Sequence, residues 1–370
     1  MWTINAACKR NRTNFPKVLD YFGRNPTCLT TSNRKLCQNL KPNPAYNVII
    51  LGSSGFTGKH VIREALKFLN TKIILNCVDP FRLYGEPVVE ACADSGCDYL
   101  DICGEPEFME RMEVKYHDKS KESGSLVVSA CGFDSVPAEL GWMFNSRQWM
   151  PPAVCSNIEA YVSLESDKRI VGNLGAYESA VLSIPGTSTK GPVVNHLEKI
   201  GLWGVKLPLA DATVVRRTLS CLAEDPRGLS GISESTEQIE RRKAFWSTIK
   251  PAHFGMKIAS KSLLGVVRFI TVGKFIALFG KTGIGRWLLL NFPSVFSLGY
   301  FRKKGPTEDE VASATFKMWF VVPLLCSGNE TIFQKKRRCF PPGIVFGPTD
   351  LQDRLQQNGI YFDVISKQVV

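Results

Sequence analysis

A continuous apolar run that ends at a glycine-rich loop constrains the fold of this chain more than any other feature. The run is Asn47–Leu51 (NVIIL), and Gly52, Gly55 and Gly58 follow it with the spacing G-x-x-G-x-x-G. Such a run is typical of a strand buried on both faces of a parallel sheet. The glycines permit a tight turn and the close approach of a phosphate, and the following helix offers free N–H groups to it. The segment predicts a nucleotide-binding loop, with a purely structural turn as the alternative.

Strand and helix patterns alternate regularly after this loop. Apolar stripes and Pro and Gly at the ends predict helices over Phe56–Leu69, Glu86–Ser95 and Glu107–Glu122. Apolar runs predict further strands over Thr71–Val78, Asp98–Cys103 and Ser125–Ala130. Strands and helices that alternate through short connections favour an α/β fold with a Rossmann-like, doubly wound parallel sheet. Binding residues are then expected at the carboxyl ends of the strands.

An acid at the end of the second strand usually holds the ribose hydroxyls of a bound dinucleotide. Asp79 occupies that place on a simple count, which would favour NAD. The departures described below argue that this match is false.

Other catalytic patterns are absent from the sequence. The four histidines lie far apart and the cysteines lack C-x-x-C spacing, so we predict no metal site and assign no catalytic residue. Asp134 and Glu139 follow a predicted strand end and could face a site, but we favour their interpretation as a turn and a helix cap. A hydride-transfer enzyme needs no conspicuous motif, because the cofactor supplies the chemistry.

Two segments carry the positive charge of the chain, whose formal net charge is +12. Residues 1–45 hold eight basic side chains and one acid, which suits a disordered basic tail or, less well, a mitochondrial transit peptide. Residues 251–304 hold nine basic side chains and no acid. The twelve cysteines are scattered without the spacing of a disulfide scaffold, so we expect reduced thiols.

The second basic segment is also strongly apolar. Leu263–Gly280 is interrupted by Arg268 and Lys274, and Trp287–Phe301 continues its aromatic character. These charges argue against a clean transmembrane helix and favour a segment that lies in a membrane interface. A buried helical core with exposed lysines is the alternative. Nucleic acid is a poor candidate for the partner of this segment, because an apolar surface does not contribute to contacts with a phosphate backbone.

Several motifs resemble those of the animal saccharopine dehydrogenase-like oxidoreductases. They are Ile49–Lys59, Asn76–Val88, Tyr99–Glu105, Gly132–Gly141, Gly283–Arg286, Phe296–Tyr300, Gly305–Thr307 and Asn358–Ile360. The resemblance covers most of residues 46–320 and about the last thirty residues.

This resemblance implies a NAD(P)-binding Rossmann domain, a second α/β domain, and association with lipid droplets or other membranes. It also implies kinship with enoyl reductases of glycolipid synthesis and a small, lipid-like substrate. The domains expected are a basic N-terminal extension (1–45), a Rossmann-like domain (46–150) and a second α/β domain (151–370) that includes the membrane-contact segment 251–304. We favour NADP as the cofactor.

The candidate cofactor-binding residues lie in the loop and after the next strand. They are Gly52, Ser53, Ser54, Gly55, Phe56, Thr57, Gly58, Asn76, Cys77 and Val78.

Three departures from the family pattern bear on cofactor binding. The family has further strands and helices where Asn70 here runs directly into Thr71, so Thr71–Val78 resembles the fourth strand of the sheet and not the second. A short stretch with Lys335–Arg338 replaces a longer glycine-rich one, and residues 1–45 have no counterpart. Loss of strands 2 and 3 removes the wall that holds adenosine and leaves strand 1 as an apolar edge. We therefore expect weak or absent cofactor binding.

Two functions follow as hypotheses. The first is an NAD(P)-dependent oxidoreductase of lipid or glycolipid metabolism on a lipid-droplet or other intracellular membrane surface, with the mitochondrion as the alternative location. The second is a non-catalytic lipid-surface interaction protein that keeps a vestigial nucleotide-binding fold.

Overall fold

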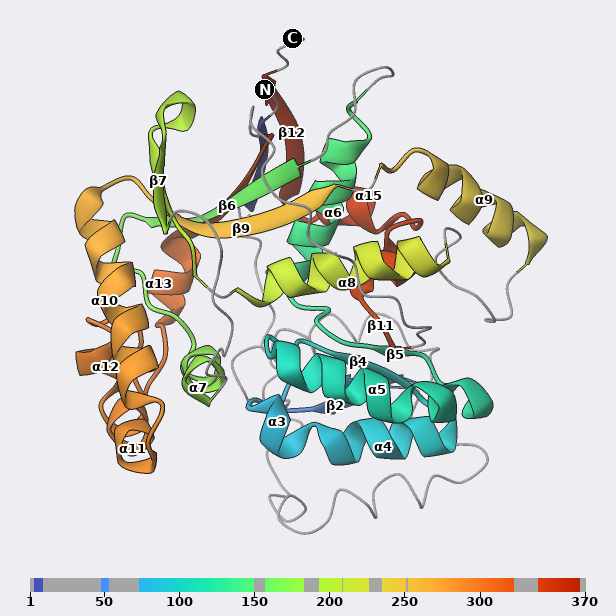
Figure 1. Cartoon of the computed structure of the whole chain (residues 1–370), viewed down its shortest axis with the longest axis horizontal. Helices are drawn as coiled ribbons and strands as arrows, with labels where there is room; N and C mark the ends of the chain where they lie inside the picture. The colour runs from blue at the N-terminus through green and yellow to red at the C-terminus, as the bar shows by residue number, and fades with distance from the viewer. Residues whose placement is uncertain are drawn as a thin grey trace.

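The computed structural model contains two β-sheets with helices packed around them (Figure 1). It describes residues 3–8, 48–52, 73–149, 157–182, 193–207, 209–225, 235–250, 252–322 and 339–366. The predicted helix Phe56–Leu69 lies outside these residues, as do Ser53–Gly58 of the glycine loop.

The first sheet is parallel, as predicted. Its five strands follow the order β11-β5-β4-β3-β2, and every pairing is parallel. They are β2 (Val48–Leu51), β3 (Ile73–Asn76), β4 (Asp98–Asp101), β5 (Val127–Val128) and β11 (Cys339–Phe340). Within the described residues β2 pairs only with β3, so it forms an edge of the sheet.

Two helices cover one face of this sheet (Figure 1). They are α4 (Glu86–Ser95) and α5 (Pro106–Ser123), and both end at a left-handed glycine, as the sequence predicts. A short helix, α3 (Phe81–Tyr84), precedes them. Successive strands are added in one direction, so right-handed crossovers place their helices on the same side.

Strand β3 is consequently not buried on both faces by the described residues, which corrects the prediction from its apolar run, whereas both residues of β5 are buried. Ile74 and Tyr99 are buried under the helices, whereas Ile73 and Leu75 on the opposite face of β3 are only half-buried.

The second sheet is mixed and mainly antiparallel. Its strand order is β12-β1-β10-β6-β9-β8-β7, and β6 with β9 is its parallel pair. The strands are β1 (Thr3–Cys8), β6 (Asn157–Ser166), β7 (Val194–Leu197), β8 (Leu202–Val205), β9 (His253–Ser260), β10 (Ala314–Val321) and β12 (Ile360–Ser366).

Two strands cross the predicted domain boundaries. β1 lies between β10 and β12, so the expectation of disorder over residues 1–45 is wrong for Thr3–Cys8. β11 pairs with β5, so residues 339–340 extend the parallel sheet although they were expected in the second domain. Both pairings join segments that are far apart in sequence, and local patterns carry no information about such partners.

Helices from several parts of the chain cover one face of the second sheet. The main core lies there, between α6 (Ser135–Ser146), α8 (Ala210–Glu224), α14 (Pro342–Phe346) and strands β6 and β10. Also present are α9 (Thr236–Ser247), α13 (Glu308–Ser313), α15 (Leu351–Gln357) and the 3-10 turn η1 (Glu198–Ile200).

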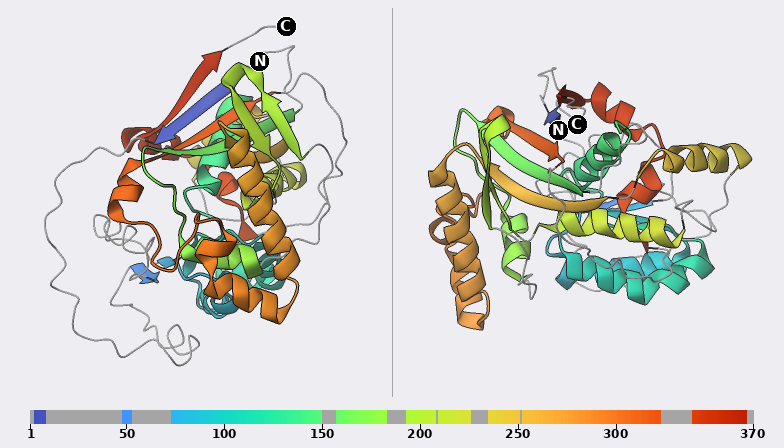
Figure 2. Two further views of the ribbon diagram at one scale, coloured as in Figure 1. Left: turned by 90° about the vertical axis from the view of Figure 1, so that its left-hand side faces the viewer. Right: turned by 45° about the horizontal axis from the view of Figure 1, so that its top comes forward.

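The apolar basic segment forms a helical column at the margin of the molecule (Figures 1 and 2). It consists of α10 (Leu263–Phe279), α11 (Gly283–Asn291) and α12 (Pro293–Phe296). It packs against α7 (Leu174–Leu182) through Tyr177, Val181 and Leu289. Among the described helices, none has the length and apolar character needed to cross a bilayer.

A buried ion pair joins α8, which packs on the second sheet, to α5, which packs on the parallel sheet. Arg217 of α8 donates through Nε and Nη2 to Oε2 of Glu113 on α5, at 3.0 and 2.7 Å. Both side chains are buried, so removal of either partner would leave an uncompensated charge.

The packing of α6 on β10 gives a prediction for Gly141. A Cβ at this position would lie 2.2 Å from Cζ of Phe320, which is fully buried. Gly141→Ala should lower the free energy of unfolding by about 1–2 kcal/mol, because overpacking outweighs the better helix propensity of alanine. Gly283→Ala is the matched control, because nothing lies within 4 Å of that Cβ. Equal denaturant midpoints for both variants would contradict this packing.

Candidate functional site

The predicted nucleotide-binding residues that the structure describes meet at the carboxyl ends of β2 and β3. Gly52 ends β2 with a φ of 75°, and its Cβ position lies 2.7 Å from the carbonyl oxygen of Cys77. The amide of Cys77 donates to the carbonyl of Leu51 at 3.0 Å. A side chain at residue 52 would therefore be both strained and obstructed, so this turn requires glycine.

A chain of buried polar side chains lies beside this turn. Asn76 Nδ2 donates to the hydroxyl of Tyr99 at 3.2 Å, and that hydroxyl donates to Oδ2 of Asp101 at 2.9 Å. Asp101 Oδ1 accepts from the amides of Cys103 and Ala130 at 2.9 and 2.8 Å. Asn76 Oδ1 in turn accepts from the amide of Val78 at 3.2 Å. This network fixes the segment after β3 to the next two strand ends.

Burial is the largest cause of the pKa shifts of Asp101 and Cys77 beside this turn. It raises the pKa of Asp101, although hydrogen bonds from Cys103, Ala130, Tyr99 and Ser129 act in the opposite direction. Burial, followed by the charges of Asp79 and Asp101, raises the pKa of Cys77 to about 11. The Cys77 thiol therefore stays protonated near neutral pH and is no candidate nucleophile.

The carboxylate of Glu105 joins the parallel sheet to the second domain. Oε1 accepts from the amide of Phe81 at 2.9 Å and from Oγ of Ser179 at 2.8 Å, and Oε2 accepts from the amide of Arg82 at 3.1 Å. Ser179 belongs to α7, so a buried acid after β4 fixes both the start of α3 and a helix of the other domain. Arg82 adds a hydrogen bond from its guanidinium to the carbonyl of Leu182.

Asp79 points into this junction. A Cβ on Gly175 of α7 would lie 2.7 Å from Oδ2 of Asp79, so the two segments are in close contact. Burial, followed by the charges of Glu105, Glu178 and Asp101, raises the pKa of Asp79 to about 6. A carboxylate close to other carboxylates and packed against α7 does not stand free to bind a ribose.

The two halves of a dinucleotide meet different surroundings at this edge. The left-handed turn at Gly52 gives the backbone clearance that a pyrophosphate needs, and the acidic cluster suits a cationic nicotinamide ring better than a phosphate. The adenosine half would lie beyond β2, where the described residues provide no further strand. The described residues thus fit one half of the cofactor. They contain no group of three potential metal ligands.

Asp134 lies in the predicted turn, at the N-cap position of α6, whereas Glu139 is not a helix cap. Asp134 occupies the position before α6, but its side chain makes no hydrogen bond to the helix. Glu139 lies inside α6, where Oε1 accepts from Oγ1 of Thr218 at 2.6 Å and burial raises its pKa to about 8. Glu139 therefore links α6 to α8. The cap interpretation is wrong for Glu139, because a sequence pattern does not show which face of a helix is buried.

Sequence reasoning missed Glu105, Ser179 and Gly175. The sequence signal for Glu105 is an acid placed between Gly104 and the helix-starting Pro106, but its partners come from α3 and α7.

Comparison with known proteins decides the family. The chain is 48% identical over 444 positions to a probable mitochondrial saccharopine dehydrogenase-like oxidoreductase of Arabidopsis thaliana, covering 88% of this chain and 98% of the relative. The chain belongs to the saccharopine dehydrogenase-like oxidoreductases. It is 30% identical to the saccharopine dehydrogenase-like oxidoreductase of Rattus norvegicus, covering 80% of this chain and 78% of that one. It is 28% identical to the lipid droplet localized protein of Caenorhabditis elegans, covering 74% and 78%. No protein-family model matches the chain.

The plant alignment also bears on the expectation that this chain lacks strands between Asn70 and Thr71. It runs over 444 positions, whereas 88% of 370 residues is about 326, so about 118 positions of the alignment have no residue of this chain. About 118 residues are enough to form two strands and their helices.

The environment of Asp79 predicts a pH dependence. Its folded pKa of about 6 exceeds an unfolded value of about 3.9, so the stability that its proton confers is present below about pH 4 and is lost as the pH rises through about 6. Asp79→Asn should therefore stabilise the protein at pH 7.5 by up to about 2 kcal/mol, after allowance for partial exposure, and have little effect at pH 4.

Urea unfolding at several pH values measures this difference. The exposed Asp167→Asn is the control and should show no comparable trend. A stability difference for Asp79→Asn that is independent of pH would show that its carboxylate is not the titrating group.

Proposed function

We propose that the protein is an NAD(P)-dependent oxidoreductase that acts on a small lipid-like substrate at a lipid-droplet or other intracellular membrane surface, and that it holds its cofactor weakly. The observation that carries the proposal is the turn at Gly52, where a φ of 75° and the 2.7 Å approach to Cys77 leave room only for backbone. When bound, the nicotinamide would supply hydride transfer. The residues at this edge would bind and orient it.

We propose NADP as the cofactor in preference to NAD. The family resemblance supports this preference and the lipid-like substrate. Membership in a family named for oxidoreductases supports redox chemistry, and the name of the worm relative supports a lipid surface. The plant relative's name supports a mitochondrial location as the alternative. The anion-free segment 251–304 supports membrane contact.

A second function is favoured by the position of β2 at the edge of the described sheet. A sheet that ends at the strand before the glycine loop has no wall for adenosine. The protein would then be a non-catalytic lipid-surface interaction protein with a vestigial nucleotide-binding fold.

Calorimetric titration with NADPH and NADH tests these alternatives. We compare this chain with a version in which the strands that the family pattern has between Asn70 and Thr71 are restored, and expect micromolar binding by the restored version alone. In that version Gly52→Ala should abolish binding, whereas Gly201→Ala should not, although Gly201 also has a positive φ, of 62°. Micromolar NADPH binding by the unmodified chain would contradict the weak-site proposal. Failure of both versions would favour the non-catalytic function.

A further inference from the structure

The helical column α10–α12 exposes an unusual amount of apolar surface. Leu264 and Val267 near the start of α10 are 65% and 58% exposed. Around the far end of the column, Ile284, Trp287 and Val295 are 79%, 58% and 66% exposed. Large apolar side chains gathered on one projecting element indicate an interaction surface, whereas scattered ones need no explanation.

Cations share the exposed face of α10 with these residues. Val267, Thr271, Lys274 and Leu278 follow one another at spacings of three and four, so they lie along one stripe of the helix. Lys274 is exposed, and so are Arg268 beside the stripe and Lys281 just beyond the helix end. These three cations make no ion pair with a described carboxylate.

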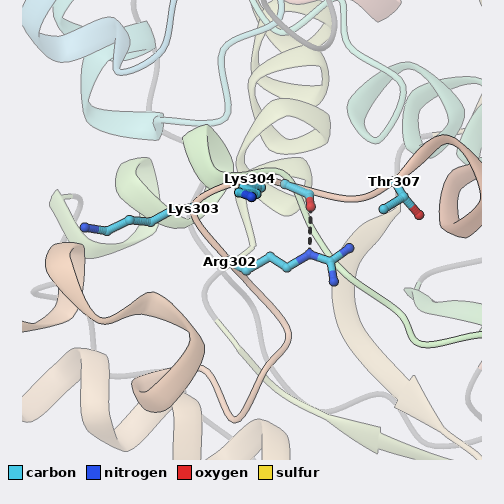
Figure 3. A pocket seen from close by; sticks show the side chains of 5 residues that line it. Arg302, Lys303, Lys304 and Thr307 are labelled. Carbon is cyan, nitrogen blue, oxygen red and sulfur yellow. Dashed lines mark hydrogen bonds between the residues drawn. The ribbon is translucent and has the colours of Figure 1, made fainter.

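A basic hollow follows α12 in the chain. It has a volume of about 380 Å³ and is lined by Arg302, Lys303, Lys304, Gly305 and Thr307 (Figure 3). Arg302 Nε donates to the carbonyl of Gly305 at 2.8 Å, and its guanidinium also pairs with Glu310. Lys303 and Lys304 are exposed, and the side chain of Lys303 extends away from this pairing. In the chain, the hollow begins four residues after the exposed Leu298.

Charge complementarity identifies the occupant. The apolar tip suits acyl chains, and the exposed cations Arg268, Lys274 and Lys281 suit anionic headgroups. We propose that α10–α12 and the hollow at Arg302–Thr307 dock this protein in the interface of a leaflet that contains anionic glycerophospholipids. A lipid phosphate occupies the hollow beside Lys303 and Lys304, and the side chains of Ile284 and Trp287 enter the acyl boundary.

This inference rests on the proposed lipid-surface function but is independent of the cofactor. Lipid binding is measured without nucleotide, so failure of the nucleotide titration leaves it intact.

Co-sedimentation of the full chain with vesicles tests the docking. We compare phosphatidylcholine alone with phosphatidylcholine that contains phosphatidylserine, and expect stronger binding to the anionic vesicles that weakens with salt. Lys303→Gln with Lys304→Gln should lower the affinity for the anionic vesicles by about fivefold for each lysine. Ile284→Ser with Trp287→Ser should lower binding to both kinds of vesicle by at least about tenfold.

Matched controls come from exposed residues on other elements. Val114→Ser changes an apolar side chain on α5 that is 73% exposed. Lys121→Gln changes an exposed lysine on the same helix. Neither should change binding, and thermal unfolding confirms that every variant folds.

Several results would overturn the docking. Equal binding to both vesicle types would show that the protein does not recognise anionic lipid. Displacement by inorganic phosphate beyond that by chloride of equal ionic strength would make the hollow a site for a free anion. A change in sedimentation coefficient of the Ile284/Trp287 variant without lipid would identify the column as an interface between two copies of this chain.

Discussion

The buried carboxylate of Glu105 is the contact on which the arrangement of the two domains depends. It satisfies two amides at the start of α3 and the hydroxyl of Ser179 on α7, so one side chain fixes the strand-end loop and the helix that covers it. A buried acid is tolerated only when such donors surround it. Because α3 begins immediately after Asp79 and Pro80, Glu105 also determines where the acidic cluster lies relative to Gly52 and Cys77.

The local patterns of the sequence were sufficient for strands β2 to β5 and for helices α4 and α5. The apolar runs at β2, β3 and β4 and the Pro and Gly residues around α4 and α5 predict these elements because strand and helix periodicities are local properties. The positions of β1 and β11 could not be predicted in this way. Their partners lie more than a hundred residues away, and only packing selects them.

The candidate site was predictable in part for the same reason. Gly52, Asn76 and Cys77 stand at strand ends, and parallel strands bring such positions to one edge. Glu105 and Ser179 meet only because α7 of the second domain packs on that edge. The role of Glu139 depended on which side of α6 is buried, and its bond to Thr218 of α8 is again a contact between distant segments.

On the function proposed above, this chain binds the nicotinamide half of a dinucleotide, and its described residues provide no further strand as a wall for the adenosine half. Competition between ligand fragments tests it most directly: the affinities of reduced nicotinamide mononucleotide and NADPH are measured by calorimetry, with adenosine 2′,5′-bisphosphate as the competitor. We expect the mononucleotide and NADPH to bind weakly, with affinities that agree within a few-fold, and the adenosine compound to displace neither. NADPH bound far more tightly than the mononucleotide, or displaced by adenosine 2′,5′-bisphosphate, would contradict it.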